Sequence, residues 1–233
     1  MIREAVILAG GLGTRLRTTV PDLPKCMAPV AGKPFIWYVL QYLKKQGVES
    51  FIFSLGYCGD MIQHYIEMEF SELTCTFVFE DQPLGTGGAI KLACDAAIER
   101  DIIIMNGDTL FTVDLDRLSS FHKQHDALCT LSLKPMIDFD RYGVVDMNQE
   151  NAIQSFREKR KYETGLINGG VYTLNVEKFT DLTLPDIFSF EKDFLEVYCQ
   201  SQKMMGLVQD EYFIDIGIPE DLEKANKEFS QQI

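Results

Sequence analysis

The fold is decided by residues 5–16, Ala-Val-Ile-Leu-Ala-Gly-Gly-Leu-Gly-Thr-Arg-Leu. The apolar run at residues 5–9 is short and β-branched, which is typical of a strand buried on both faces of a parallel sheet. Three glycines then remove the Cβ atoms that would keep a ligand from the backbone, and the exposed N–H groups of such a turn bind anions. Thr14 and Arg15 add a hydroxyl group and a fixed positive charge. The stretch therefore predicts a phosphate-binding turn after the first strand.

This turn differs from two well-known phosphate-binding motifs. No Gly-Lys-Ser/Thr sequence closes it, so it is not a Walker loop. The spacing Gly11-x-Gly13 lacks the third glycine of the dinucleotide fingerprint. Because glycines are frequent in turns for steric reasons, the turn alone leaves a purely structural interpretation open. The segment at residues 24–34, which carries Lys25 and Lys33, favours anion binding.

Strands and helices alternate along the first half of the chain. Apolar runs predict further strands at residues 51–55, 74–79 (near a sheet edge) and 101–105. Helical spacing of apolar residues predicts helices at 34–45, 60–69 (with Asp60 as N-cap) and 87–99 (with Ile98 on the apolar face). In the less regular second half, we expect strands at 127–134, 142–146 and 166–174 and helices at 188–199 and 221–229. We predict a three-layer, doubly wound α/β fold with a mostly parallel, Rossmann-like sheet.

Composition limits the classes of function. With 233 residues, 46% of them hydrophobic, the chain can bury a full core as one domain. Its net charge of −13 argues against binding of nucleic acid or an anionic membrane, so any anion site must be locally basic. No apolar run approaches the ~20 residues that span a bilayer and no signal peptide is evident, which predicts a cytoplasmic protein. The six scattered cysteines favour free thiols over a metal cluster or disulfides.

Taken together, these motifs resemble the sugar-1-phosphate nucleotidylyltransferase family. The resemblance rests on the glycine turn followed by Pro24-Lys25 and Gly32-Lys33-Pro34, and it extends along nearly the whole chain. Four segments are similar to the D-glycero-α-D-manno-heptose-1-phosphate guanylyltransferase branch, namely residues 80–90, 139–143, 166–172 and 212–217.

The resemblance implies a reaction, a cofactor and a domain organisation. The reaction would join GTP to D-glycero-α-D-manno-heptose 1-phosphate with release of pyrophosphate, and Mg²⁺ would be the cofactor. The fold would be the mixed-sheet nucleotidyltransferase (GT-A-like) type. Residues 1–233 would form one domain, with a nucleotide-binding half at about 1–115 and a sugar-binding half at about 116–233. A homo-oligomer is left open.

The same resemblance implies four groups of site residues. At the nucleotide we expect Leu8, Ala9, Gly10, Gly11, Gly13, Thr14, Arg15, Glu80, Leu84, Gly85, Thr86 and Asp108. At the sugar phosphate we expect Tyr142, Gly143, Glu158, Lys159, Asn168 and Gly169. Arg15, Lys25 and Asp108 would be catalytic, and Asp108 and Asp215 would bind Mg²⁺.

Asp108 directly follows the predicted strand at residues 101–105, within Asn106-Gly107-Asp108. Ligands of open α/β sheets bind at the carboxyl ends of strands, and hard carboxylate oxygens suit Mg²⁺. Asn-Gly-Asp is also ordinary turn sequence, and Asp215 could equally be a strand-end or N-cap residue. The family resemblance favours metal binding for both.

The assignment of the base- and sugar-binding residues depends mainly on the family resemblance. Gly85 would let the backbone approach a purine, and Glu80 would accept from guanine N–H groups, although the sequence does not separate guanine from uracil or thymine. Lys159 would meet the sugar phosphate as a point charge, although residues 157–161 also have the composition of a solvated charge run.

Other classes of function are weighed against this one. A non-catalytic nucleotide-sensing module would favour loss of the charged residues, yet Arg15, Lys25 and Asp108 are present. A glycosyltransferase would need an Asp-x-Asp metal motif, and Asp114-Leu115-Asp116 has that form. Within the family, mannose, N-acetylmuramate or glucose 1-phosphate with GTP, UTP or dTTP are the alternatives. The histidines at 64, 122 and 125 are too dispersed for a metal site and are expected on helix surfaces.

Overall fold

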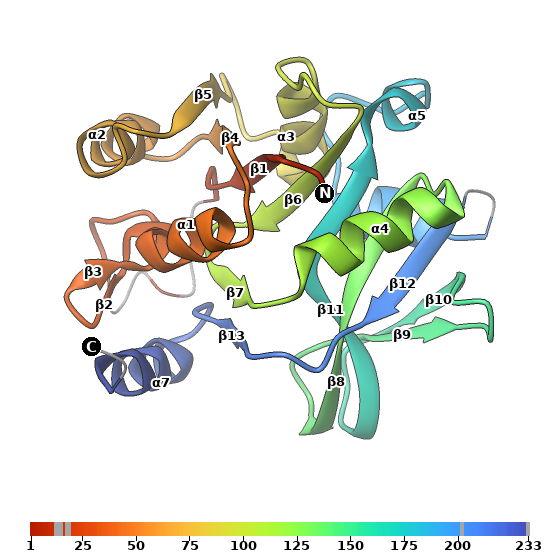
Figure 1. Cartoon of the computed structure of the whole chain (residues 1–233). Coiled ribbons are helices and arrows are strands. Elements are labelled where there is room, and N and C mark those ends of the chain that lie inside the picture. The colour runs from red at the N-terminus through yellow and green to blue at the C-terminus, as the bar shows by residue number, and fades with distance from the viewer. Residues whose placement is uncertain (12–15, 17–19, 201–202, 232–233) are drawn as a thin grey trace.

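The structure is a computed structural model that describes residues 1–11, 16, 20–200 and 203–231 (Figure 1). Its centre is a seven-stranded sheet. In spatial order the strands are β12 (Met204–Val208), β8 (Cys129–Phe139), β11 (Tyr162–Asn175), β6 (Asp101–Asn106), β1 (Glu4–Leu8), β4 (Ser50–Leu55) and β5 (Thr74–Phe79). Only β11 runs antiparallel to its neighbours; the remaining neighbouring pairs are parallel. The predicted mostly parallel mixed sheet is confirmed.

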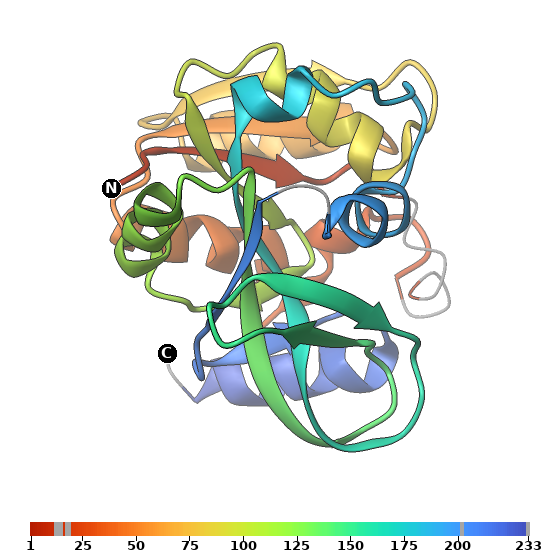
Figure 2. The same ribbon diagram turned by 90° about the vertical axis from the view of Figure 1, so that its right-hand side faces the viewer.

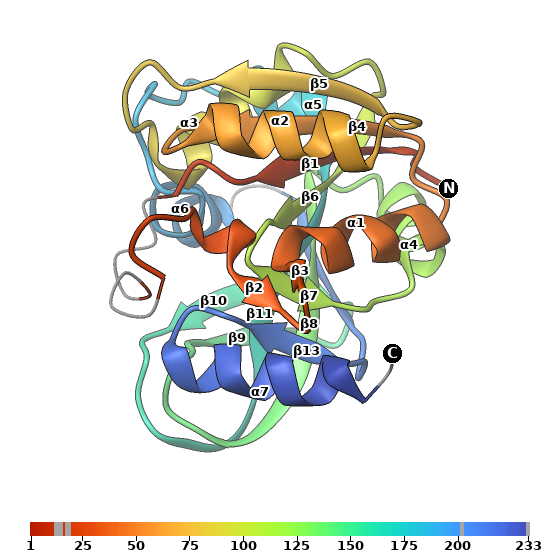
Figure 3. The same ribbon diagram turned by 90° about the vertical axis from the view of Figure 1, so that its left-hand side faces the viewer.

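Helices cover both faces of this sheet, which gives three layers (Figures 1 and 3). One hydrophobic core joins the sheet to α1 (Phe35–Lys45), α2 (Gly59–Glu69), α4 (Leu115–His125) and α7 (Pro219–Ser230). The other core joins it to α3 (Gly85–Cys94), α5 (Val176–Thr180), the π-helix η2 (Phe190–Leu195) and α6 (Glu196–Tyr198). Because both faces are covered, β1, β4 and β6 are buried along most of their length, whereas the edge strand β5 is partly exposed.

Short strand pairs extend the main sheet. β7 (Thr109–Phe111) pairs antiparallel with β13 (Phe213–Asp215), and β2 (Pro29–Val30) pairs with β3 (Lys33–Pro34). β9 (Val144–Met147) pairs with β10 (Ile153–Arg157) where β8 and β11 extend past the sheet (Figure 2). A single 3₁₀ turn, η1 (Lys25–Met27), precedes β2. None of the helices described has the length and apolar character that crossing a membrane requires.

The helix predicted at residues 188–199 is the π-helix η2 followed by the short α6, and α3 and α2 also differ from the prediction. α3 ends at Cys94 rather than residue 99, and Ile98, predicted on its apolar face, is 86% exposed. The buried carboxylate of Glu4 accepts hydrogen bonds from the N–H groups of Ile98 and Glu99 (2.8 and 2.9 Å), so this segment bonds to β1 instead of continuing the helix. The N-cap of α2 is Cys58, in the left-handed conformation, and not the predicted Asp60.

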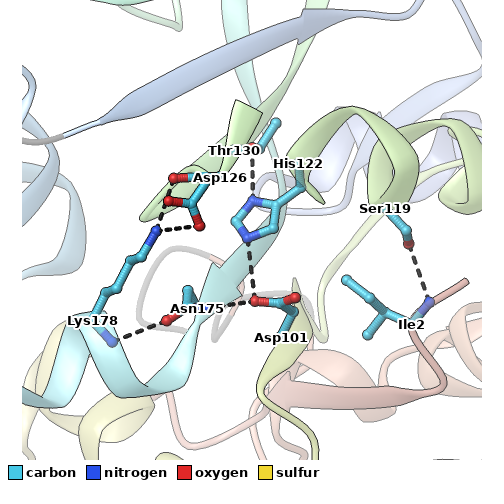
Figure 4. A network of polar contacts seen from close by, with 8 residues as sticks. All are labelled: Ile2, Asp101, Ser119, His122, Asp126, Thr130, Asn175 and Lys178. Atoms are coloured by element: carbon cyan, nitrogen blue, oxygen red, sulfur yellow. Dashed lines mark hydrogen bonds and ion pairs between the residues drawn. The ribbon is translucent and has the colours of Figure 1, made fainter. Parts of the chain in front are cut away.

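His122 was expected on a helix surface, and this prediction is wrong because its side chain is 2% exposed. Its Nδ1 lies 2.8 Å from Thr130 Oγ1, and its Nε2 lies 3.6 Å from Asp101 Oδ1 (Figure 4). Asn175 Nδ2 also donates to Asp101 Oδ1 (2.6 Å). Burial alone would raise the pKa of Asp101, but the hydrogen bonds from His122 and Asn175 lower it below its ordinary value. The network ties α4 to β6, β8 and β11.

His122→Ala should lower the free energy of unfolding by about 1–3 kcal/mol, because it leaves buried Thr130 and Asp101 short of a partner. Chemical denaturation measures this. His64, which is exposed on α2, gives the matched control, and His64→Ala should change the stability by less than about 0.5 kcal/mol. Equal effects of the two substitutions would contradict the role of this network.

Candidate active site

A cavity of about 650 Å³ opens at the carboxyl ends of β1, β4 and β6, where Leu8, Ser54 and Asn106 line it. This is the edge at which open α/β sheets bind ligands. Nine of the residues predicted from the sequence line the cavity: Leu8, Ala9, Gly10, Gly11, Lys25, Glu80, Gly85, Thr86 and Asp108. Gly13, Thr14 and Arg15, the rest of the predicted anion-binding turn, lie outside the described residues.

The start of the glycine turn is packed against the loop after β5. A Cβ atom on Gly10 would lie 2.4 Å from Glu80 Oε1 and 3.1 Å from the Gly56 nitrogen, so glycine permits this close approach. Glu80 Oε2 accepts the Leu84 N–H (2.9 Å), which closes the loop at residues 80–84. Burial raises the pKa of Glu80, and the hydrogen bond from Leu84 opposes that shift. Leu84 itself is not among the described lining residues.

Lys25 lies between two carboxylates. Its Nζ hydrogen-bonds Asp108 Oδ2 and lies 3.6 Å from Asp215 Oδ1. The pairing of β7 with β13 brings the two aspartates together: Asp215 lies opposite Thr109, and the Ile216 N–H donates to the Asp108 carbonyl (3.1 Å). Residues 107 positions apart in the sequence thereby meet at the cavity edge.

The charges of this cluster do not balance. Burial and the neighbouring Asp108 carboxylate raise the pKa of Asp215, although Lys25 acts in the opposite direction. Two ionised carboxylates and one ammonium would leave an excess negative charge, which a divalent cation could neutralise. Hard oxygen donors from two carboxylates also fit Mg²⁺, which usually takes its other ligands from water and phosphate. Among the residues described, no group of three or more His, Cys, Asp or Glu side chains could hold a metal.

Cys26, next to Lys25, lines the same cavity but is an unreactive thiol. Burial, followed by the effect of the Asp108 carboxylate, raises its pKa to about 12. A thiol with so high a pKa is protonated at neutral pH and is a poor nucleophile. Cys26 is one of the six cysteines expected, and found, to be free thiols.

The predicted sugar-side residues lie outside the cavity lining. Among them, Tyr142 lies close to Asp215, since burial and the Asp215 carboxylate raise the pKa of its hydroxyl. Asn168 braces an irregularity in β11: its Nδ2 donates to Tyr172 Oη (2.9 Å), and its Oδ1 accepts the Gly170 N–H (3.1 Å). Gly143 and Gly169 are packed tightly, because a Cβ would lie 2.4 Å from the Arg157 carbonyl or 2.2 Å from the Phe111 ring, respectively.

Most cations of the charge run at residues 157–161 contact residues of β8, β9 and β11. Arg157 Nη2 donates to Asp146 (2.6 Å), Lys161 lies 3.4 Å from Asp138, and Arg160 stacks over Tyr162. Glu158 and Lys159 are exposed, and no ion pair joins Lys159 to any other described residue. Lys159 is therefore a cation of this run that has no acidic partner among the described residues.

The Asp-x-Asp sequence at 114–116 is used structurally. Asp114 is the N-cap of α4, where its side chain accepts the Arg117 N–H (2.9 Å). Asp116 is 61% exposed and lies 3.6 Å from the N-terminal ammonium. Neither residue is among the described lining of the cavity, which counts against a glycosyltransferase metal site here.

The sequence analysis missed several lining residues, including Ser54 near the end of β4, Gly56 and Tyr57 just after it, and Glu191 on η2. The first three could have been found, because they lie at or just past the carboxyl end of a predicted buried strand of a parallel sheet. Glu191 has no such local signal, because the π-helix that carries it approaches the site only through its packing on α3.

At the carboxyl edge of this open α/β sheet, Gly10 and Gly11 lie near a pair of carboxylates bridged by Lys25, an arrangement typical of proteins that bind phosphorylated ligands. The chain belongs to the nucleotidyl transferase family, whose family model matches residues 4–232. The nucleotidyltransferase fold expected from the sequence is thereby confirmed.

Two relatives are D-glycero-α-D-manno-heptose 1-phosphate guanylyltransferases. The protein from Aneurinibacillus thermoaerophilus is 46% identical over 230 residues, which cover 99% of this chain and all of the relative. The one from Campylobacter jejuni is 43% identical over 218 residues, which cover 94% and 96%. The crystal structure of HddC from Yersinia pseudotuberculosis complexed with GMP-PN matches with a TM-score of 0.87 and 38% identity, covering 98% of this chain and all of that one.

Gly85→Ala should destabilise the protein by about 1–3 kcal/mol. Gly85 has a φ of +72°, and a Cβ atom there would lie 2.5 Å from the Phe188 carbonyl oxygen. Gly11→Ala is the control, because no atom of the described residues lies within 4 Å of a Cβ at that position. Thermal melting of both variants tests the difference, and an unchanged melting temperature for Gly85→Ala would contradict the described packing.

Proposed function

We propose that the protein transfers the guanylyl group of GTP to D-glycero-α-D-manno-heptose 1-phosphate, with release of pyrophosphate. The observation that carries the proposal is the Lys25–Asp108–Asp215 cluster at the edge of a nucleotide-sized cavity. The choice of GTP and of a heptose follows from near full-length similarity to two guanylyltransferases for that sugar and to a structure that holds a guanine nucleotide analogue.

The proposed chemistry needs no general base. An oxygen of the sugar phosphate attacks the α-phosphorus, a new P–O bond forms, and the bond from the α-phosphorus to the bridging oxygen of pyrophosphate breaks. A phosphate monoester dianion is already an adequate nucleophile, so catalysis rests on positioning and on neutralising charge. Lys25, at 14% side-chain exposure, supplies its ammonium at the cavity edge, where it would stabilise charge on the α-phosphate.

Mg²⁺ would be held by Asp108 and Asp215 together with phosphate oxygens and water. When bound, it supplies positive charge that screens the repulsion between the two anionic substrates. Lys25 would then exchange its bond to Asp108 for one to the nucleotide.

The other expected residues take their roles within this scheme. The backbone of residues 8–11, with Gly13, Thr14 and Arg15, would hold the triphosphate, and the loop of Glu80, Leu84 and Gly85 would contact the base. From the second half of the chain, Lys159 would bind the sugar phosphate. The remaining sugar-side residues proposed are Tyr142, Gly143, Glu158, Asn168 and Gly169.

Lys25→Ala and Asp108→Ala should each lower kcat/KM at least about a hundredfold, by analogy with the loss of one charge-stabilising contact in a transition state. Pyrophosphate release with Mg²⁺, GTP and the heptose 1-phosphate measures this. Lys44→Ala is the control, because Lys44 forms an ion pair with Glu72 on the surface.

Wild-type protein should turn over this substrate pair faster than pairs with UTP or dTTP, or with mannose, N-acetylmuramate or glucose 1-phosphate. If the protein prefers another pair, the proposed substrates would be wrong, but the proposed mechanism would still hold. Absence of pyrophosphate release with every pair would contradict the proposed function and favour a nucleotide-sensing role.

A further inference from the structure

The start of α3, which lines the cavity, packs against residues 186–191. The Gly87 N–H donates to the Phe188 carbonyl (2.9 Å), and the Phe188 N–H donates to the Leu84 carbonyl (3.0 Å). A Cβ on Gly88 would lie 2.2 Å from the Asp186 carbonyl oxygen, so the two segments touch backbone to backbone. Movement of residues 186–191 must therefore move the start of α3 as well.

Thr86 is the side chain that joins these two segments inside the cavity. Its hydroxyl accepts the Phe190 N–H (2.9 Å) and donates to Glu191 Oε2 (2.7 Å). A hydroxyl has one proton to donate, so Thr86 cannot give a second hydrogen bond to a nucleotide without releasing Glu191. Its geometry is that of a residue that orients another side chain.

In Glu191, both hydrogen bonds from the described residues to the carboxylate are made to Oε2, so Oε1 is free to accept another from a ligand. Ser189 Oγ donates to the same Oε2 (3.1 Å) that Thr86 holds, and within the described part of the chain no hydrogen bond reaches Oε1. Both Thr86 and Glu191 line the cavity. The carboxylate lies on a π-helix, a form that is rare and frequent at functional sites.

We propose that Thr86 is a positioning residue: its hydroxyl fixes Glu191 so that Oε1 accepts a hydrogen bond from a hydroxyl group of a bound sugar ring. An ionised carboxylate accepts hydrogen bonds and repels phosphates, which selects the hydroxyl-bearing part of a substrate over its phosphates. The inference rests on the proposed function, in which both the ribose of GTP and the sugar 1-phosphate offer such hydroxyls.

The test compares Thr86→Val, which keeps the shape and removes the hydroxyl, with Thr86→Ser, which keeps the hydroxyl. Initial rates give kcat and a KM for each substrate. Thr86→Val should raise one KM about tenfold with kcat within about twofold, and Thr86→Ser should restore it. A change in the KM for GTP identifies the ribose, and a change in the KM for the sugar phosphate identifies the sugar. Thr180→Val, at an exposed hydroxyl on α5, should change neither.

Glu191→Gln should raise the same KM, and adding Thr86→Val to it should have no further effect, because Thr86 acts through Glu191. Unchanged KM values in Thr86→Val or in Glu191→Gln, or multiplying effects in the double variant, would overturn the inference. A wild-type protein that releases no pyrophosphate would instead overturn the proposed function, and this inference with it.

Discussion

The site depends on the ion pairs that the Lys25 ammonium forms with Asp108 and Asp215. They join three parts of the chain that the sheet alone would leave apart: the segment after β1, the turn after β6 and the end of β13. Burying two carboxylates side by side is costly unless a cation lies between them. The two carboxylates therefore attract a further cation to the point where two anionic substrates would meet.

The rest of the fold holds this cluster in place. Parallel strands β1, β4 and β6 end at one edge of the sheet, so Gly10, Gly11, Ser54 and Asn106 face a common cavity. The antiparallel strand β11 returns the chain across the sheet, and β13 then reaches back to pair with β7. Both halves of the sequence thus contribute to the site.

Much of the fold could be predicted because buried parallel strands have continuous apolar runs, as at residues 51–55 and 101–105. The position of Asp108 at the site could be predicted because this residue follows the second of these runs. The three-residue strands β7 and β13 are too short for periodicity, and their pairing depends on distant contacts. His122 looked like a surface residue because its partners, Asp101 and Thr130, come from other strands. Glu191 reaches the cavity by packing alone, which no local pattern reveals.

The most direct test asks whether the Lys25–Asp108–Asp215 cluster binds the metal and the nucleotide. Electron paramagnetic resonance, with Mn²⁺ in place of Mg²⁺, measures the affinity for Mn²⁺·GTP in the absence of the sugar phosphate. Asp215→Asn should weaken this binding at least about tenfold, since even residues that only orient metal ligands have effects of that size. Asp210→Asn, at a surface carboxylate paired with Lys134, should leave it unchanged. Equal affinities of wild-type protein and Asp215→Asn would contradict a role for this cluster in holding the metal and the nucleotide.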